Sequence, residues 1–296
     1  MQDSTLKILF VINPSSGAKS KKNWETITSE YFKSLPHTIE FFLLTGKNDA
    51  ASLQYWIDKF KPDRVVAVGG DGTVSLVANQ LLSSPIAMGI LPAGSANGMA
   101  KELQIPATAE GAMDIILHGK IMCCDLICIN DETISLHLSD LGVNAQLIKY
   151  FEEDNIRGKL GYAKLVFRVL MNKRLMHVTI KTDKEEIKTD AFMVVIANAS
   201  KYGTGALINP EGNLHDGLFE IVIVRRLHFW SVLKTFLHFK RLNPKKVELL
   251  QAKSAVIRTT KKIHFQVDGE YLGKVNYVKA DILPAQLNLL LPIKKL

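Results

Sequence analysis

Apolar runs and amphipathic segments alternate along the first part of the chain. The runs are short and nearly continuous, whereas in the segments between them apolar residues recur every three or four positions. We predict strands at 7–14, 37–45, 64–70 and 86–94, and helices at 21–35, 49–60 and 73–82. Because strands that are apolar on both faces are typical of parallel sheets, we expect an α/β domain with helices on both faces of a parallel sheet.

The pattern changes near residue 125, where strand-like runs begin to follow one another. These runs lie at 121–129, 133–141, 175–182, 189–198, 218–225, 254–259, 262–268 and 286–291, and helical segments lie at 159–172 and 228–242. Successive strands with few helices favour an antiparallel β-sandwich. We therefore expect two domains with a cleft between them. An α/β domain would span 1–125, with 292–296 as candidates to rejoin it, and a β-sandwich would span 126–291.

Composition places the chain among globular proteins. Of its 296 residues 47% are hydrophobic, enough for two cores. No apolar run approaches the ~18 residues that a membrane span needs. The first stretch, MQDSTLKILFVINP, has an early acidic residue and no small-residue cleavage site, so it predicts a first strand and not a signal peptide. We expect a cytoplasmic protein.

The three cysteines, Cys123, Cys124 and Cys128, lie close together in one apolar run. An odd number of cysteines in such a run does not form a disulfide framework. Zinc ligation is an alternative, but no His or Cys pair at zinc-like spacing stands elsewhere in the sequence. We expect buried, reduced thiols.

The formal net charge of +8 favours an anionic partner. A nucleotide, a nucleic acid and an acidic membrane face all fit this charge, and so does a charge that serves only solubility. The aromatic residues are spread out and are not interleaved with the basic runs. We therefore do not expect a nucleic-acid partner.

The stretch Gly-Gly-Asp-Gly-Thr at 69–73 follows the third strand and opens the third helix. Glycines there let the backbone approach a ligand and permit positive φ, while the helix start offers N–H groups that bind phosphate. The P-loop and dinucleotide fingerprints do not fit. Asp71 would repel phosphate unless a cation bridges them, so it suits Mg²⁺ on a triphosphate. The alternative is a tight turn with Asp71 as N-cap.

Two further loops should emerge at the same edge of the sheet, because they follow the first and fourth strands. They are NPSSG at 13–17 and LPAGSANG at 91–98. Serine hydroxyls can donate to phosphate, and asparagine amides can bridge loops or contact the base or ribose. The side chains concerned are Ser15, Ser16, Ser95, Asn13 and Asn97. Three such loops at one edge favour a nucleotide site.

In order along the chain, NPSSG, GGDGT, LPAGSAN, HDGLFEIVIV (215–224) and VDGEYLG (267–273) resemble the diacylglycerol/sphingosine lipid kinase family. The resemblance covers nearly the whole chain. GGDGT alone is shared with NAD kinases and phosphofructokinases, whose α/β fold is similar. NAD kinases would be expected to carry a stretch like GINxGxxGFL after the first motif, whereas this chain has MGILPAGSANGMAKEL. The resemblance implies an ATP-binding α/β domain and a β-sandwich domain for the lipid.

The resemblance further implies an enzyme that phosphorylates a lipid hydroxyl with ATP and Mg²⁺. It places the ATP phosphates on 69–73, with the loop 13–17, Thr45 and Ser95 completing the nucleotide site. Thr45 ends the second strand, where a hydroxyl can meet a nucleotide. The nucleotide-binding residues implied are Asn13, Pro14, Ser15, Ser16, Gly17, Thr45, Gly69, Gly70, Asp71, Gly72, Thr73, Ser95 and Asn97.

By the same resemblance Glu270 is the catalytic acid/base. Asp71, which suits Mg²⁺ on the triphosphate, is the second catalytic residue that we predict. Glu270 follows an apolar strand in a Gly-containing turn and would accept the proton of a lipid hydroxyl as that oxygen attacks the γ-phosphorus. Because a hydroxyl is a weak acid, most catalysis should come from in-line positioning and from Mg²⁺ neutralising charge. Taken alone, Asp-Gly-Glu is a hairpin turn.

A second, structural Mg²⁺ is implied by the resemblance at the turn before the strand 218–225. Its ligands would be the Asp216 carboxylate and the carbonyl groups of Asn213 and Leu218, with Asp125 reaching the metal through water. An ordinary turn aspartate is the alternative for Asp216 and for Asp125.

One position departs from the family pattern. Many bacterial members have Asp directly after the asparagine of the fourth-strand loop, but this chain has Gly98, so the task of that carboxylate is absent or falls to Asp71 or Asp125. The form of this loop leans toward a sphingoid-like over a diacylglycerol-like substrate. A non-catalytic nucleotide- or lipid-sensing module and an NAD kinase-like kinase of a soluble metabolite stay open as alternatives.

A lipid substrate would be met at a membrane surface. The segment 228–242 carries an apolar helical stripe of Phe229, Trp230, Leu233, Phe236 and Leu237. Basic residues near it or on the helix before it are Lys234, Lys240, Arg241, Lys159, Lys164 and Arg168. The pattern fits an interfacial helix, and packing onto the protein's own sheet is the alternative. We expect peripheral contact with an anionic membrane and leave a homodimer open.

Overall fold

The computed structural model describes residues 5–16, 23–154, 169, 175–201, 207–210, 212–225 and 247–293. Contacts divide the chain into two compact units. Unit 1 contains Met1–Cys124 and Ala285–Leu296, and unit 2 contains Asp125–Pro284. The helices expected at 159–172 and 228–242 fall outside the described residues, apart from Val169.

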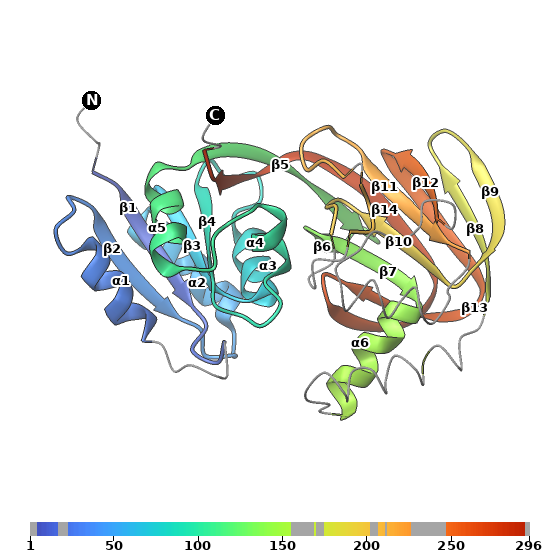
Figure 1. Ribbon diagram of the computed structural model, residues 1–296, viewed down its shortest axis with the longest axis horizontal. Coiled ribbons are helices and arrows are strands. Elements are labelled where there is room, and N and C mark those ends of the chain that lie inside the picture. Colours follow the sequence, from blue (N-terminus) through green and yellow to red (C-terminus); the bar gives the residue numbers. More distant parts are fainter. Residues whose placement is uncertain are drawn as a thin grey trace. The chain divides into compact units, whose positions relative to one another are not determined.

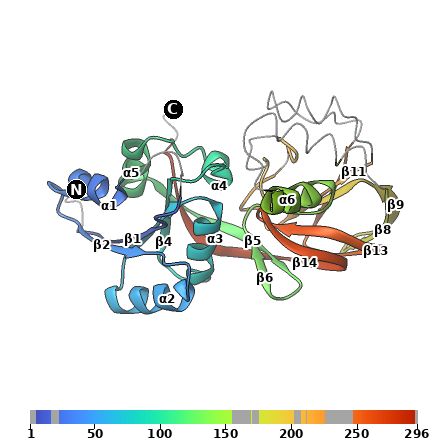
Figure 2. The same ribbon diagram turned by 90° about the horizontal axis from the view of Figure 1, so that it is seen from below.

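Unit 1 is built on parallel strands with helices on both faces, as predicted. Strands β1 (Lys7–Ile12), β2 (Thr38–Leu43), β3 (Arg64–Gly69) and β4 (Ala87–Pro92) pair in the order β4-β3-β1-β2. Its helices are α1 (Trp24–Phe32), α2 (Asp49–Phe60), α3 (Asp71–Gln80), α4 (Gly98–Glu102) and α5 (Ala109–His118). Helices α1 and α5 cover one face, and α2 and α3 cover the other (Figure 2). The sequence did not predict α4 and α5.

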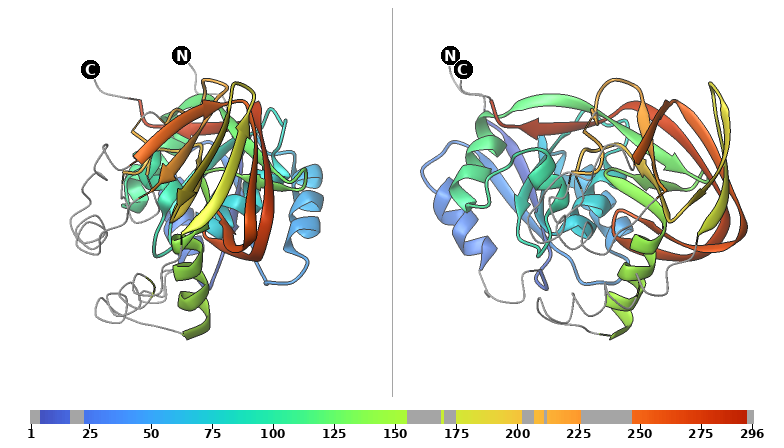
Figure 3. Two further views of the ribbon diagram at one scale, coloured as in Figure 1. Left: turned by 90° about the vertical axis from the view of Figure 1, so that its right-hand side faces the viewer. Right: turned by 45° about the vertical axis from the view of Figure 1, so that its right-hand side comes forward.

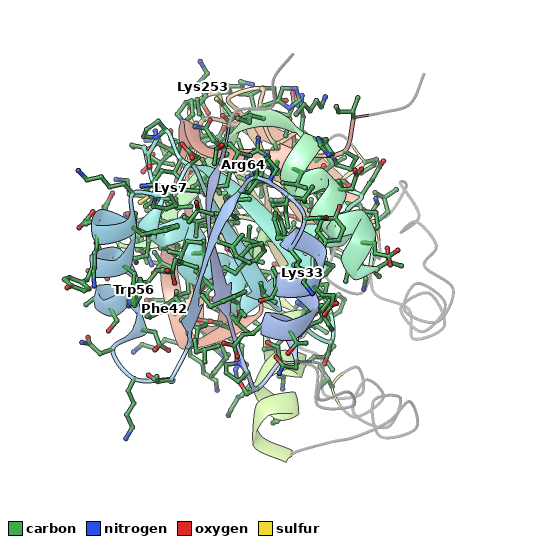
Figure 4. All side chains as sticks on the ribbon, turned by 90° about the vertical axis from the view of Figure 1, so that its left-hand side faces the viewer. Lys7, Lys33, Phe42, Trp56, Arg64 and Lys253 are labelled. Carbon is green, nitrogen blue, oxygen red and sulfur yellow. The ribbon has the colours of Figure 1, made fainter. Side chains whose placement is uncertain are left out.

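The core of unit 1 explains the continuous apolar runs. Every residue of β1 after Lys7 is buried, and so are the inner residues of β3 and β4. Phe10 lies at the centre, with its ring centroid 5.6 Å from that of Phe32. Each such side chain contributes roughly 1.5–3 kcal/mol when it is buried. Arg64, labelled in Figure 4, starts β3 and donates to the carbonyl oxygens of Ile116 and Leu117 at the end of α5.

Strands β5 (Lys120–Ile129) and β14 (Glu270–Leu291) each have residues in both units (Figure 1). The end of β14 pairs in parallel with β4, through Leu289 and Met88. Gln286 accepts a 2.9 Å hydrogen bond from the N–H of Ser83, and Leu287 and Leu290 are buried. The chain therefore returns to unit 1 at residue 285, before the 292–296 considered from the sequence.

Unit 2 is an antiparallel β-sandwich, as predicted. Its remaining elements are β6 (Thr133–Ser135), β7 (Leu138–Gly142), α6 (Val143–Asp154), β8 (Met176–Thr182), β9 (Glu186–Ala191), β10 (Met193–Ala197), β11 (Phe219–Val224), β12 (Val247–Ala252) and β13 (Ser254–Val267). One layer runs β12-β11-β10-β7-β13, and the other contains β9, β8, β13 and β14. Strand β13 joins both layers because its residues 255–259 pair with β8 and its residues 265–267 pair with β7. Between these parts its register against β14 shifts. Figure 3 shows the twist of these strands.

Two apolar clusters stabilise unit 2. The larger lies between the layers and includes Phe219, Phe265 and Ile257. The smaller covers the opposite face of β10 and β11 and includes Val143 and Leu147 of α6. The alternation along β8, with Met176, Val178 and Ile180 buried and the residues between them more exposed, is the expected period of two.

The cysteines are free thiols, but they are not all buried. Cys124 is buried and Cys128 is half-buried, and burial raises the pKa of the Cys128 thiol. The expectation was wrong for Cys123, which is exposed because the first half of β5 runs along the surface. In the part of the chain that the structure describes, no helix is long and apolar enough to cross a bilayer.

Candidate functional site

Strand β3 ends at Gly69, and helix α3 begins at Asp71, with Gly70 as its N-cap. The first N–H bonded within the helix is that of Val74, which donates to Gly70 across 3.1 Å. The N–H groups of the first turn therefore point out of the helix at the positive end of its dipole. This arrangement, at the carboxyl end of a parallel strand, is suited to binding phosphate.

The glycines of 69–73 allow two loops to touch, and positive φ plays no part. Gly70 has φ −94°, and neither Gly69 nor Gly72 has positive φ, so that part of the expectation was wrong. A Cβ on Gly94 would lie 2.4 Å from the Cα of Gly70, and a Cβ on Gly69 would lie 2.2 Å from the hydroxyl of Thr73. The loops after β3 and β4 therefore pack backbone against backbone.

Asp71 links the same two loops through its side chain. Its carboxylate accepts hydrogen bonds from the N–H groups of Gly98 (3.0 Å) and Met99 (3.1 Å), which open α4. It is therefore not the N-cap of α3, because Gly70 holds that position. Each carboxylate oxygen keeps further lone-pair capacity for a cation. Gly98, where relatives were expected to carry Asp, supplies one of the N–H donors.

Asn13 links the first loop to the third strand and its helix. Its amide nitrogen donates to the Thr73 hydroxyl at 3.3 Å, and its backbone N–H donates to Val68 at 3.0 Å. Its Oδ1 accepts from the Ser15 hydroxyl (2.7 Å) and the Ser15 N–H (3.0 Å). The loop that contains Asn13, Pro14, Ser15 and Ser16 is thus tied to the loop at 69–73. Gly17 lies outside the described residues.

Asn97 organises its own loop. It has φ 50°, in the left-handed region, and its side-chain amide both accepts from and donates to the backbone of Gly94 at 2.9 Å. Ser95 is exposed at the tip of this loop. The Asn97 amide therefore supports the loop, and the hydroxyl of Ser95 is presented to solvent.

Thr45 is engaged in the turn that precedes α2. Its N–H donates to the Asp49 carboxylate at 2.9 Å. Its hydroxyl has two acceptors within reach, the Asp49 carboxylate (2.9 Å) and the carbonyl of Lys47 (3.1 Å). The backbone N–H of Thr45 is the main reason why the pKa of Asp49 is lowered. Thr45 therefore stabilises the turn before α2 through its contacts with Asp49.

The turn proposed for a structural cation lies in unit 2. The Asp125 N–H donates to the carbonyl of Leu214, and the buried Asp125 carboxylate accepts from the Gly217 N–H, both at 2.7 Å. Asp216 accepts from the N–H of Leu218 at 3.0 Å. Asp125 thus lies directly against the turn that contains Asn213, Asp216 and Leu218.

Asn198 supports this turn and was missed from the sequence. It is buried, its side-chain nitrogen donates to the backbone carbonyl of Asp125 at 2.8 Å, and its Oδ1 has no hydrogen-bond partner among the described residues. Carboxylate, carbonyl and amide oxygens are donors that suit Mg²⁺, so the donor set fits the ion. Within the described ranges no group of three or more His, Cys, Asp and Glu could hold a metal, so a cation would need backbone or phosphate oxygens.

Glu270 begins β14 directly after a two-residue hairpin turn. Val267 pairs with Glu270, and between them Asp268 (φ 49°) and Gly269 (φ 95°) both have positive φ. This is the turn that Asp-Gly favours. The Glu270 side chain is exposed, whereas Asp268 is held among donors from 135–138. The sequence motif pointed to Glu270 but did not show that Asp268 is half-buried and bound by the backbone of 135–138.

Two protein-family models match this chain. The model of the diacylglycerol kinase catalytic domain matches residues 7–129, and that of the YegS C-terminal NAD kinase beta sandwich-like domain matches 139–291. The lipid kinase YegS of Escherichia coli K12 is 28% identical over 266 residues, 86% of this chain and 87% of the relative. The probable lipid kinase YegS of Shigella boydii is 27% identical over the same shares.

Solved structures share the fold. A putative diacylglycerol kinase from Bacillus anthracis superimposes with a TM-score of 0.78 at 21% identity, covering 98% of each chain. An NAD kinase from Archaeoglobus fulgidus in complex with ATP gives a TM-score of 0.56 at 12% identity, covering 96% of this chain and 93% of that one. The expected α/β and β-sandwich architecture is confirmed, and so is the resemblance noted in the motifs.

Proposed function

Because the chain belongs to the lipid kinase family that joins a diacylglycerol kinase catalytic domain to a YegS-type β-sandwich, we propose that it phosphorylates a lipid hydroxyl with ATP and Mg²⁺. The acceptor would be a diacylglycerol-like or sphingoid-like lipid. The family supports a lipid kinase, and the geometry of the loops in unit 1 supports ATP as the donor.

One observation carries the proposal: three loops at the carboxyl edge of the parallel sheet are fastened to one another. Asn13 binds Thr73, Asp71 binds the N–H groups that open α4, and Gly70 meets Gly94. Loops that are fixed in this way are pre-organised, so they lose little conformational entropy when a polyphosphate binds. The N–H groups at the start of α3 would contact phosphate oxygens, and the hydroxyls of Ser15, Ser16 and Ser95 would be supplied by the loops after β1 and β4.

Magnesium would be held in two places. Asp71 would orient the ion on the triphosphate, and the turn with Asp216, together with Asp125, would hold a structural ion. When bound, Mg²⁺ neutralises charge that develops on the transferring phosphoryl group. The carboxylate of Asp71 is already fixed by two N–H donors, so its orientation is set before any ion arrives.

Glu270 would act as general base. Its carboxylate takes the proton of the lipid hydroxyl while the hydroxyl oxygen forms a bond to the γ-phosphorus and the bond from phosphorus to the β,γ-bridging oxygen breaks. The exposed position of Glu270 at the end of a hairpin leaves it accessible to a substrate. In-line positioning would supply most of the rate enhancement.

The test is transfer of labelled γ-phosphate from ATP to a panel of diacylglycerols, sphingoid bases and ceramides, with products identified by mass spectrometry. We expect Glu270→Gln to lower kcat roughly 10²–10⁴-fold. Glu186→Gln is the matched control, since Glu186 is a strand glutamate whose carboxylate lies 3.5 Å from Lys188. A wild-type protein that binds ATP but labels no lipid would support a sensing module, and labelling of NAD⁺ in place of lipid would support a soluble-metabolite kinase.

We also propose peripheral contact with anionic membranes. The segments 155–174 and 226–246 together contain twelve Lys and Arg and no Asp or Glu. Clustered basic residues are attracted to anionic lipid surfaces, each by about 1 kcal/mol. We expect binding to vesicles to rise with phosphatidylglycerol content, to fall with salt, and to weaken when Lys234, Lys240 and Arg241 become glutamate. Binding that ignores anionic lipid content would contradict this.

A further inference from the structure

A partly buried hydrogen-bond network holds the turn that carries Glu270. We propose that Asp268 and Gln266 are positioning residues, which act on phosphoryl transfer by fixing the backbone from which the Glu270 carboxylate extends. The inference deepens the proposed function and depends on it, because the role of Glu270 as general base belongs to that proposal. Nothing in the proposed chemistry uses Asp268 or Gln266 directly.

Asp268 holds the turn from one side. Its carboxylate accepts from the Ser135 hydroxyl (2.9 Å) and from the N–H groups of Leu136 (2.7 Å), His137 (3.0 Å) and Leu138 (3.0 Å). Its own N–H donates to the carbonyl of Leu138 at 3.0 Å. The backbone between β6 and β7 therefore closes around one carboxylate.

Asp268 is half-buried, so water solvates its charge only in part and the donors around it matter. Burial raises the pKa of its carboxyl, whereas the N–H groups of Leu136 and His137 oppose that rise by favouring the ionised form. Hydrogen bonds to an ionised acceptor are stronger than bonds between neutral groups. The four donors therefore fix the position of the carboxylate and offset part of the cost of desolvating its charge.

Gln266 holds the turn from the other side. Its Oε1 accepts from the Gly269 N–H at 2.7 Å, and its Nε2 donates to the Asp140 carboxylate at 2.5 Å. Gln266 and Asp140 are also register partners between β13 and β7. Asp140 in turn accepts from the N–H of Ala145 at 2.9 Å, in the first turn of α6. A continuous chain of buried polar groups thus joins the start of α6 to Gly269, the residue before Glu270.

The hairpin does not need this network in order to form. Asp-Gly and Asn-Gly both make this two-residue turn readily, and neither requires a buried side chain. Nothing lies within 4 Å of a Cβ built on Gly269, and Glu270 is exposed, so packing from outside does not fix the turn. Restraint comes from the buried side through Asp268 and Gln266. A displacement of ~1 Å at a reacting group lowers the rate up to ~10²-fold. Restraint of the turn would therefore raise the rate by keeping the Glu270 carboxylate in position.

A double-mutant cycle on the full chain tests the inference. The variants are Asp268→Asn, Gln266→Leu and Glu270→Gln, singly and combined, with Ser135→Ala as a milder change that removes one donor to Asp268. The probe is transfer from ATP to 1,2-dioctanoylglycerol in mixed micelles, or to the best acceptor of the lipid panel. Asp131→Asn is the matched control, because Asp131 is also a turn aspartate of unit 2 with positive φ, but its carboxylate is exposed and binds Lys279 at 2.6 Å.

We expect Asp268→Asn and Gln266→Leu each to lower kcat about 10–10²-fold, with the KM for ATP within about twofold of the wild-type value. In the Glu270→Gln background the same changes should lower kcat by less than about twofold, since residues that act through one group are not additive. Losses that multiply in the double variants would overturn the inference, and so would a fall in kcat for Asp131→Asn as large as that for Asp268→Asn.

Amide hydrogen exchange measures the restraint without any substrate. We expect faster exchange in the peptide that covers 266–272 in Asp268→Asn and in Ser135→Ala, with exchange in β10 and β11 close to that of the wild type. Unchanged exchange there would overturn the claim that the network holds the turn. If Glu270→Gln keeps full kcat, the proposed role of Glu270 fails and the catalytic part of the inference fails with it, while the exchange result still decides on the restraint.

Discussion

Gly94→Ala should separate the two loops that form the floor of the nucleotide site. The new Cβ would lie 2.4 Å from the Cα of Gly70, 3.0 Å from its N, and 2.9 Å from Oδ1 of Asn97. Two of these neighbours are backbone atoms, which cannot rotate away. The loop after β4 must therefore move relative to the loop after β3.

The size of the movement follows from the contact distances. Ordinary carbon–carbon contacts lie near 3.5–4.0 Å, so the loops must part by roughly 1 Å. Overpacking of this kind costs about 1–3 kcal/mol, which corresponds to about 2–12 °C in the unfolding midpoint of a domain of this size. The same displacement would move the N–H groups of α3 relative to Ser95, so we expect ATP to bind about 10-fold more weakly or worse.

The assay compares thermal unfolding without ligand and calorimetric binding of Mg²⁺ and ATP. Gly70→Ala is the matched control for unfolding, because it probes the same contact from the other side, where its Cβ would lie 3.3 Å from the Cα of Gly94. That distance needs a shift of only a few tenths of an ångström. A Gly94→Ala protein that unfolds and binds ATP like the wild type, or a larger destabilisation by Gly70→Ala, would refute the reasoning.

Three further changes test other parts of the structure. Arg64→Met should lower the free energy of unfolding by about 1–3 kcal/mol in urea titrations, because two carbonyl groups at the end of α5 lose their donor; an unchanged midpoint would contradict this. The pKa of Asp49 is lowered in the fold, so its ionised form stabilises the fold above the ordinary pKa of about 3.9. This contribution is lost as pH falls. Between about pH 5 and 3 the unfolding midpoint of the wild type should therefore fall more than that of Asp49→Asn. Gly142→Ala should destabilise unit 2 by roughly 2–4 kcal/mol, because Gly142 has φ 113° and the new Cβ would lie 2.3 Å from a carbonyl oxygen. Gly273→Ala, at φ 91° in open space, should cost about 1–2 kcal/mol. Thermal unfolding measures both.

The periodicity of the sequence was enough to predict the two kinds of domain. Runs that are apolar on both faces gave the parallel strands of unit 1, and β8 shows the alternation of a half-exposed strand. The loops after β1, β3 and β4 could be grouped because parallel strands end at one edge. Each of these features depends on residues close together in the chain or on a general property of parallel sheets, so the sequence alone reveals it.

Long-range pairing could not be read in the same way. The run 286–291 was assigned to the sandwich because it follows other strands, but its register partner is Met88. The predicted strand 133–141 is broken into β6 and β7, because the N–H groups of Leu136 and His137 turn toward Asp268 instead of a neighbouring strand. No pattern of local polarity reveals a carboxylate more than a hundred residues away.

The sequence motifs located the candidate site but did not reveal the hydrogen bonds within it. Spacing pointed to Asp71 and Asn97 as groups for metal and nucleotide, whereas the structure shows them holding α4 and their own loop. Asn198 and Gln266 lie inside apolar strands or next to them, where a single polar residue gives no signal until its partners are known.

Residues 285–291 complete the sheet of unit 1, but a ribosome makes them only after the whole of unit 2. At ~5–20 residues per second the delay is roughly 10–30 s. During that time β4 presents an unpaired apolar edge, which is a surface that chaperones bind and that other nascent chains can join. The domain that is begun first is therefore finished last, and the sandwich must fold while its neighbour is still incomplete.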